Sequence, residues 1–185
     1  MNTGFIILFS LISFLAGGLT GLLIYVPLYP NLEVRKILRK FLARGNTYGA
    51  WDHLMELADH NMKDIVKPNC ETFYSVSFIR KADGPYILSM PAFDCYFSFA
   101  FLRMNTDVMG YITNRDANPA SANDFIISYS KIENPGLRLS GIELDSDVTW
   151  IIGRFELTDA ENLKRVNEIQ GNIKLTPLRN YLHDD

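Results

Sequence analysis

An uncharged apolar segment near the N-terminus constrains this chain more than any other feature. Residues Gly4 to Val26 read GFIILFSLISFLAGGLTGLLIYV and contain no charged side chain. As a helix this segment would be about 34 Å long, at about 1.5 Å per residue, which is enough to cross a bilayer. A cleaved signal peptide normally has a basic start and a shorter apolar region, whereas here no basic residue precedes a long apolar core. The sequence therefore predicts an uncleaved, single-pass membrane anchor over residues 1–27.

A basic amphipathic segment follows, over residues 28–46. Pro27 and Pro30 are expected to end the spanning helix, because proline lacks an amide hydrogen and restricts the residue before it. A second helix is predicted from Leu32 to Arg44, with apolar residues at helical spacing on one side. The basic residues expected at the membrane surface are Arg35, Lys36, Arg39 and Lys40. This helix is predicted either to lie on anionic headgroups or to be an ordinary packed helix with a solvated charged face.

The charges beside the apolar segment bear on membrane topology. Five basic residues follow the segment closely and none precedes it. Basic residues near a spanning helix favour the cytoplasmic side, so this rule alone predicts a cytoplasmic domain.

Composition narrows the function of the soluble domain, residues 47–185. A chain of 185 residues has room for one ordinary domain plus the anchor. With 48% hydrophobic residues and a net charge of −3, it resembles neither a disordered chain nor a basic nucleic-acid-binding protein. No nucleic acid partner is expected. Cys70 and Cys95 show no C-x-x-C spacing, and a disulfide between them is left open.

The soluble domain is predicted to begin with a helix from Tyr48 to Lys67. His53, Glu56 and His60 would share one face of that helix, where hydrated surface residues are favoured over a metal site. After Pro68, short apolar runs alternate with turn residues, which is typical of antiparallel sheet. The predicted strands are Thr72 to Ile79, Tyr86 to Ser89, Cys95 to Leu102, Val108 to Thr113, Phe125 to Tyr129 and Val148 to Leu157.

The predicted fold class is α+β and mainly antiparallel β, sandwich or barrel-like, with a transmembrane helix and two or three amphipathic helices. In the run YFSFAFL, Phe97, Phe99 and Phe101 share one face, which belongs in a core. A capping box predicts a helix from Asp159 to about Gln170, followed by an extended tail.

Three blocks of the soluble part resemble a known family. They are NCETFYS at Asn69 to Ser75, GPYILSMP at Gly84 to Pro91 and TWIIGRFELTDAENLKRVNEIQGNIKLTPL at Thr149 to Leu178. In this order they are similar to the N-x-D-T-x-Y-S, P-x-x-L-S-x-P and W-x-x-G-R to L-T-P-L blocks of the domain-of-unknown-function 1254 family. The resemblance covers Thr47 to Leu178, and no agreed activity comes with it.

The resemblance implies a mainly β domain that is often joined to, or encoded beside, a partner domain of the 1214 family. A separately encoded 1214-family protein is therefore an expected partner by analogy, together with membrane lipid. Many family members are exported or membrane-anchored. The resemblance therefore favours a periplasmic or extracellular domain, whereas the flanking charges favour a cytoplasmic one. The side of the membrane that carries the domain is left open.

Arg154 interrupts an otherwise apolar run, and a buried guanidinium needs an acidic partner. The first hypothesis is an ion pair with Glu71 that locks two strands together, since both residues lie in the family-like blocks. The second is a ligand-binding arginine in a pocket, and the third is simple exposure. The candidate binding residues are Asn69, Glu71, Thr72, Tyr74, Trp150 and Arg154.

Catalytic and cofactor motifs are missing from the sequence. No histidine occurs between His60 and His183, which argues against Ser-His and Cys-His pairs in the sheet domain. No G-x-G-x-x-G or phosphate loop occurs, so no cofactor is expected. Asp145 and Asp147 are interpreted as hydrated turn residues.

The preferred hypothesis is a membrane-anchored interaction or accessory module that docks a partner protein. The alternative is a small-molecule or lipid-binding domain, enzymatic or not, with a pocket near Arg154.

Overall fold

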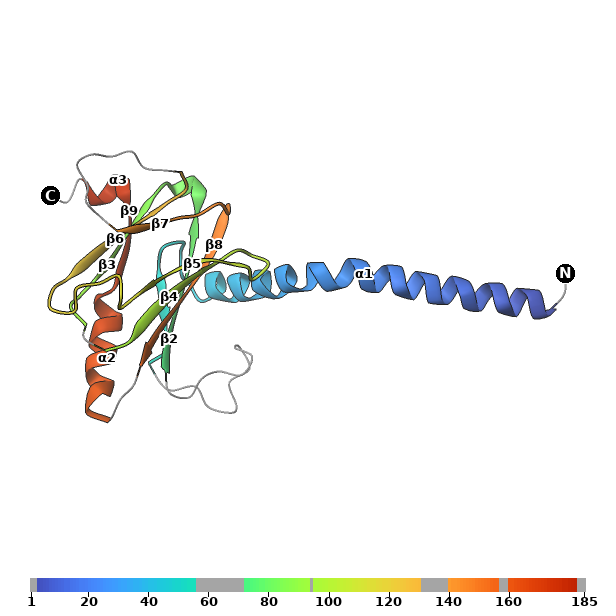
Figure 1. Cartoon of the computed structure of the whole chain (residues 1–185), viewed down its shortest axis with the longest axis horizontal. Coiled ribbons are helices and arrows are strands. Elements are labelled where there is room, and N and C mark those ends of the chain that lie inside the picture. The colour runs from blue at the N-terminus through green and yellow to red at the C-terminus, as the bar shows by residue number, and fades with distance from the viewer. Residues whose placement is uncertain (1–2, 56–71, 94, 131–139, 157–159, 183–185) are drawn as a thin grey trace.

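A long N-terminal helix projects from a two-layered β domain (Figure 1). The computed structural model describes residues 3–55, 72–93, 95–130, 140–156 and 160–182. The helix, α1 (Thr3–Ala43), has 41 residues. Its side chains are exposed from Thr3 to Tyr29, and this part is long and apolar enough to cross a membrane. Beyond Pro30 the helix packs against the domain.

α1 continues through Pro27 and Pro30, so the prediction that these prolines end the helix is wrong. Each proline removes one backbone hydrogen bond, but its fixed φ is compatible with a helix. The segment after the prolines is held by tertiary packing, because Val34 and Phe41 are buried in a cluster with Phe78 of the sheet. This packing offsets the lost hydrogen bonds. One helix therefore joins the apolar segment directly to the domain.

Two sheets form the β domain, and nearly all of their described strand pairs are antiparallel. The five-stranded sheet has the order β1-β2-β8-β4-β5, and the four-stranded sheet has the order β7-β6-β3-β9. The first contains β1 (Trp51–His53), β2 (Thr72–Arg80), β8 (Val148–Glu156), β4 (Phe97–Leu102) and β5 (Val108–Thr113). The second contains β7 (Gly141–Glu143), β6 (Asn123–Ser128), β3 (Tyr86–Met90) and β9 (Lys174–Pro177). The predicted α+β class, mainly antiparallel with a long apolar N-terminal helix, is confirmed.

Three further helices are described, and all are much shorter than α1. They are η1 (Lys81–Asp83), α2 (Ala160–Asn172) and α3 (Leu178–Tyr181). Each predicted strand has an observed counterpart, and α2 corresponds to the predicted C-terminal helix. The predicted helix from Tyr48 to Lys67 is wrong at its start, because residues 51–53 form β1 instead. They pair with the open edge of β2, a tertiary interaction that overrides the local helical pattern. Residues 56–71 lie outside the described residues.

Alternating side chains of the central strands build the core between the sheets. Phe97, Phe99 and Phe101 are fully buried on the inner face of β4, as predicted. Buried and half-buried residues alternate along β8, so Trp150 and Arg154 face outward, toward α1. The layers are therefore α1, the five-stranded sheet, the core and the four-stranded sheet.

Gly153 marks a close approach of two aromatic rings to the backbone of β8. A Cβ at this position would lie 3.0 Å from Cε1 of Phe99 and 3.3 Å from Cε2 of Phe155. Both rings are fully buried, and they contact each other edge to face with centroids 5.7 Å apart. Neither ring can shift without disturbing a densely packed core. This packing explains the glycine within the W-x-x-G-R block.

We expect Gly153→Ala to lower the free energy of unfolding by about 1–3 kcal/mol, the usual effect of overpacking a core. Gly171→Ala is the matched control, since an added Cβ there meets no described atom within 4 Å. That substitution in α2 should be neutral or stabilise by up to about 1 kcal/mol. Denaturant unfolding of the full-length chain in detergent measures both. Wild-type stability of the Gly153 variant would show that the core accommodates a methyl group at this position.

Candidate functional site

A groove separates part of α1 from the outer face of the five-stranded sheet. Its volume is about 540 Å³. One wall is formed by α1 between Tyr29 and Lys40, and the other by β2 and β8. Thr106, in the loop between β4 and β5, also borders the groove. The groove therefore begins next to the exposed apolar part of the helix.

The sheet wall of the groove follows from the register of two antiparallel strands. Tyr74 of β2 pairs with Arg154 of β8, and Val76 pairs with Ile152. Side chains directly opposite each other on one face are neighbours, so these four residues form a continuous patch. The patch is apolar except for the guanidinium of Arg154 and the hydroxyl of Tyr74.

Aromatic packing closes the end of the groove away from the apolar segment. Phe78 stacks on Trp150 with centroids 6.2 Å apart, and Phe41 of α1 meets Phe78 edge to face at 5.3 Å. Aromatic pairs of this geometry contribute about 0.5–1.5 kcal/mol beyond the burial of their area. The contact fixes α1 at one end, while the space near Pro30 stays open.

The groove carries an excess of positive charge. Lys36, Lys40 and Arg154 line it together with one carboxylate, Glu33, so three cations face one anion. Nζ of Lys36 donates a hydrogen bond to Oε1 of Glu33 at 2.7 Å. The guanidinium of half-buried Arg154 lies 5.8 Å from the ring centre of Tyr74, within range of a cation–π interaction. Apolar walls with convergent cations suit an anion that has an apolar part.

The structure brings together three of the predicted binding residues, Tyr74, Trp150 and Arg154. Thr72 lies on β2 and is buried, but it does not line the groove. Asn69 and Glu71 lie outside the described residues, so the ion pair expected between Glu71 and Arg154 stays a prediction.

The four basic residues predicted at the membrane surface divide between two sides of α1. Lys36 and Lys40 line the groove, whereas Arg35 and Arg39 are exposed and do not line it. The apolar stripe of the same segment packs on the domain, through residues such as Val34. Sequence reasoning missed the helical wall of the groove because it placed a break at the prolines. The apolar repeat after the prolines predicts a helix there, but it does not show that this helix continues the apolar segment.

A buried polar chain joins β1, β2 and α2 elsewhere in the domain. Nδ1 of His53 lies 2.8 Å from Oγ of Ser75, and Nε2 of Gln170 donates to the same Oγ at 3.0 Å. Because Oγ accepts from Gln170, its hydrogen is available to Nδ1, which favours the neutral tautomer protonated at Nε2. Burial lowers the pKa of His53 and supports this neutral form.

The Ser-His pair corrects the expectation that the sheet domain lacks one, since His53 enters the sheet through β1. Ser75 and Gln170 have no exposed surface, so the pair links structural elements in the interior and offers no accessible nucleophile. His53 is half-buried in a strand, not on a solvent face of a helix. Among the described residues, no group of three or more His, Cys, Asp or Glu side chains is placed to hold a metal.

Asp145 also has a structural role in the described part of the chain. Its carboxylate accepts a hydrogen bond at 2.9 Å from Nε of Arg103, which belongs to the loop after β4. This hydrogen bond holds the pKa of Asp145 below its usual range, so the residue stays ionised. An exposed, paired carboxylate of this kind suits a turn residue.

Comparisons with known proteins agree with this architecture. A family described as "Protein of unknown function (DUF1254)" matches residues 48–177. A search of curated proteins finds no match. The crystal structure of the VPA0106 protein from Vibrio parahaemolyticus is similar, with a TM-score of 0.64, 14% sequence identity and coverage of 86% of this chain and 38% of that one.

A putative uncharacterized protein from Burkholderia cenocepacia matches with a TM-score of 0.49 and 11% identity, over 71% of this chain and 37% of that one. This chain therefore spans well under half the length of the two solved structures. The similarity to the Vibrio protein concerns the fold alone. Since the family match extends over more than half of the sequence, the chain belongs to the DUF1254 family of proteins of unknown function.

Proposed function

We propose that this chain is a single-pass membrane protein whose domain binds an anionic amphiphile, of the anionic phospholipid class, in the groove beside α1. The observation that carries the proposal is the half-buried Arg154, which borders a groove with apolar walls and two further cations. Anionic headgroup oxygens would accept hydrogen bonds from the guanidinium, which forms planar, paired contacts with phosphate. The apolar part of the ligand would lie against side chains such as Ile152 and Ile37.

The position of the groove along α1 supports a ligand that comes from the bilayer. Tyr29 lies three residues beyond Val26, the last residue of the predicted spanning segment Gly4 to Val26, which is about 5 Å along a helix. The headgroup layer on each side of a bilayer is about 5–8 Å thick. In the proposed membrane-spanning arrangement the groove would therefore start at headgroup level and lead away from the membrane toward Lys40.

The groove beside Arg154 leaves room for a ligand whether or not this residue also pairs with Glu71, which lies outside the described residues. A lock would enclose the guanidinium in a dry interior with a carboxylate. Among the described residues, the ring of Tyr74 lies 5.8 Å from the guanidinium of Arg154, which borders an open groove of about 540 Å³. A half-buried cation beside such a groove attracts an anion more strongly than a fully hydrated cation does.

We expect the full-length chain to stay in the membrane fraction after alkaline carbonate treatment and to be released by detergent. Replacing Leu11 and Leu15 together by Asp should release it from the membrane, because carboxylates at the centre of a spanning helix cost about 2.5–3.5 kcal/mol each. Leu42→Asp, which changes an exposed residue of α1 outside the apolar segment, is the control and should stay in the membrane. Recovery of the wild-type chain in the soluble fraction would contradict the anchor.

We expect ligand binding in the groove to change the fluorescence emission of Trp150. The chain has two tryptophans, so Trp51→Phe leaves Trp150 as the sole tryptophan, whose emission can be excited selectively over that of tyrosine. In this background, titration of the full-length chain in detergent with dioctanoyl phosphatidylglycerol should change the emission saturably. The zwitterionic dioctanoyl phosphatidylcholine should bind more weakly. Arg154→Gln should weaken binding of the anionic lipid about 10-fold or more, the usual effect of losing a charge-assisted hydrogen bond.

The control for the groove titration is Arg115→Gln. Arg115 is exposed in the turn after β5 and carries the same charge, so its removal should leave the affinity unchanged. Equal affinity for the two lipids, or equal binding by the Arg154 variant and the parent, would show that the groove does not select an anionic headgroup.

Docking of a separately encoded protein is the second candidate function. The fold shared with the Vibrio protein occupies 38% of that longer chain, so there it occurs beside further polypeptide. A protein of the 1214 family, expected from the sequence resemblance, would take that place here. We expect a tagged full-length chain, purified in mild detergent from its own cells, to retain this protein in a fixed ratio. A lone monomer under these conditions would count against docking.

A further inference from the structure

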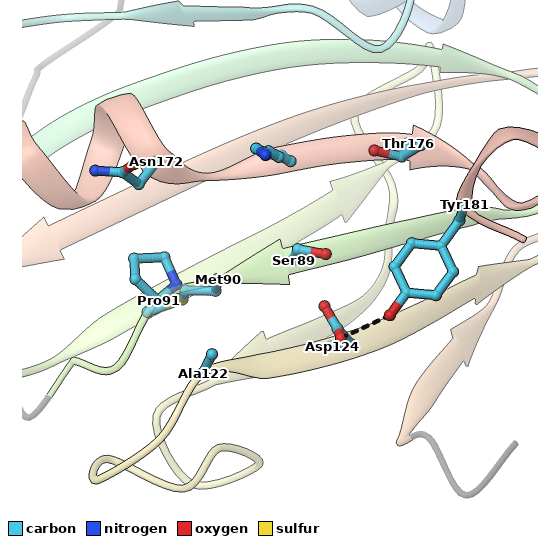
Figure 2. Close-up of a pocket in the computed structure, with 9 residues that line it drawn as sticks. Ser89, Met90, Pro91, Ala122, Asp124, Asn172, Thr176 and Tyr181 are labelled. Carbon is cyan, nitrogen blue, oxygen red and sulfur yellow. Dashed lines mark hydrogen bonds between the residues drawn. The ribbon is translucent and has the colours of Figure 1, made fainter. Parts of the chain in front are cut away.

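The four-stranded sheet lies on the other side of the domain from α1 (Figure 1), and its outer face bears a second cavity (Figure 2). Its volume is about 450 Å³, within the range of sites for small molecules. The cavity differs from the groove because much of its lining is polar. The polar side chains that line it are Ser89, Asp124, Asn172, Lys174, Thr176 and Tyr181.

Three of these side chains form a row across neighbouring strands. Asp124 of β6 pairs with Ser89 of β3, and Ser89 pairs on its other side with Lys174 of β9. Because adjacent strands lie about 4.8 Å apart, the backbone positions of Asp124 and Lys174 are about 10 Å apart, with the serine between them. Thr176 follows Lys174 by two residues and therefore extends the same face of β9.

α3 places an aromatic ring beside this row. Tyr181 lies across from Asp124, and its hydroxyl donates a hydrogen bond to Oδ2 of Asp124 at 2.9 Å (Figure 2). Pro91 lies on the opposite side of the row from Tyr181, so the polar floor has a ring on each side (Figure 2). Asn172, at the end of α2, completes the rim.

We propose that this cavity binds a carbohydrate, in the form of a short oligosaccharide. A sugar hydroxyl both donates and accepts, so it can donate to Asp124, accept from Lys174 and do either with the hydroxyls of Ser89 and Thr176. The C–H face of a sugar ring is apolar and suits the ring of Tyr181. A purely apolar ligand of the same size would desolvate these polar groups without pairing them, which costs about 1–3 kcal/mol for each group.

The test is titration of the full-length chain with chitotriose and cellotriose, followed by calorimetry and saturation-transfer NMR. The chain is kept in a zwitterionic detergent without a sugar headgroup, because a maltoside headgroup would itself compete for the cavity. We expect saturable binding of at least one of the two sugars in the millimolar range or tighter. Exchange into dodecyl maltoside should reduce this binding.

Two substitutions that remove one polar function each should weaken sugar binding about 5-fold or more. Asp124→Asn removes the charge of the acceptor, and Tyr181→Phe removes the hydroxyl that positions it. The matched controls are Asp147→Asn and Tyr111→Phe, which change exposed residues outside the cavity and should bind as the wild type does. Thermal unfolding confirms that each variant is folded, and Ser89→Ala provides a third probe of the row.

Arg154→Gln separates this site from the groove, since it should leave sugar binding unchanged whether or not the groove binds lipid. Failure of both sugars to bind, or unchanged binding by the Asp124 and Tyr181 variants, would overturn the proposal. Tighter binding of the zwitterionic tripeptide Gly-Gly-Gly, lost in the same variants, would overturn it as well. That result would show that Asp124 and Lys174 bind the two opposite charges of a zwitterionic ligand rather than the hydroxyls of a sugar.

Discussion

The packing of α1 against the five-stranded sheet determines where the groove lies. Phe41 of the helix, Phe78 of β2 and Trp150 of β8 form one aromatic contact at the end of the helix. This contact holds the helix close to the sheet at one end and leaves a groove near Pro30. α1 covers the outer face of the first sheet, whereas the outer face of the second sheet bears a cavity with a more polar lining.

The parts of the fold that were predictable from sequence are those with a local signal. Alternation places Phe97, Phe99 and Phe101 inside, since a strand must point every second side chain to one face. Two errors arose where distant contacts override local preference. β1 forms because the edge of β2 offers hydrogen bonds, and α1 passes two prolines because Val34 and Phe41 are held by the sheet. Neither tertiary contact can be recognised from the residues near β1 or near the two prolines.

The candidate site was also predictable only where its residues have a local sequence signal. The residues of the sheet wall, Tyr74, Trp150 and Arg154, were found because a cation in an alternating apolar strand is conspicuous. Lys36 and Lys40 were recognised as membrane-surface residues, but their position opposite Arg154 depends on the uninterrupted helix. The row from Asp124 through Ser89 to Lys174 has no sequence signal, because strand register across three elements creates it.

The uninterrupted course of α1 through Pro27 and Pro30 has a mechanical consequence. The helix joins the apolar segment to the domain without a loop, so in the proposed membrane-spanning arrangement a tilt of the apolar segment would be transmitted to the domain. A spanning helix tilts when the hydrocarbon layer becomes thinner than its apolar length. Such a tilt would swing the far face of the domain sideways and change how steeply the groove meets the bilayer surface. Lipid thickness would thereby govern the orientation of the whole domain.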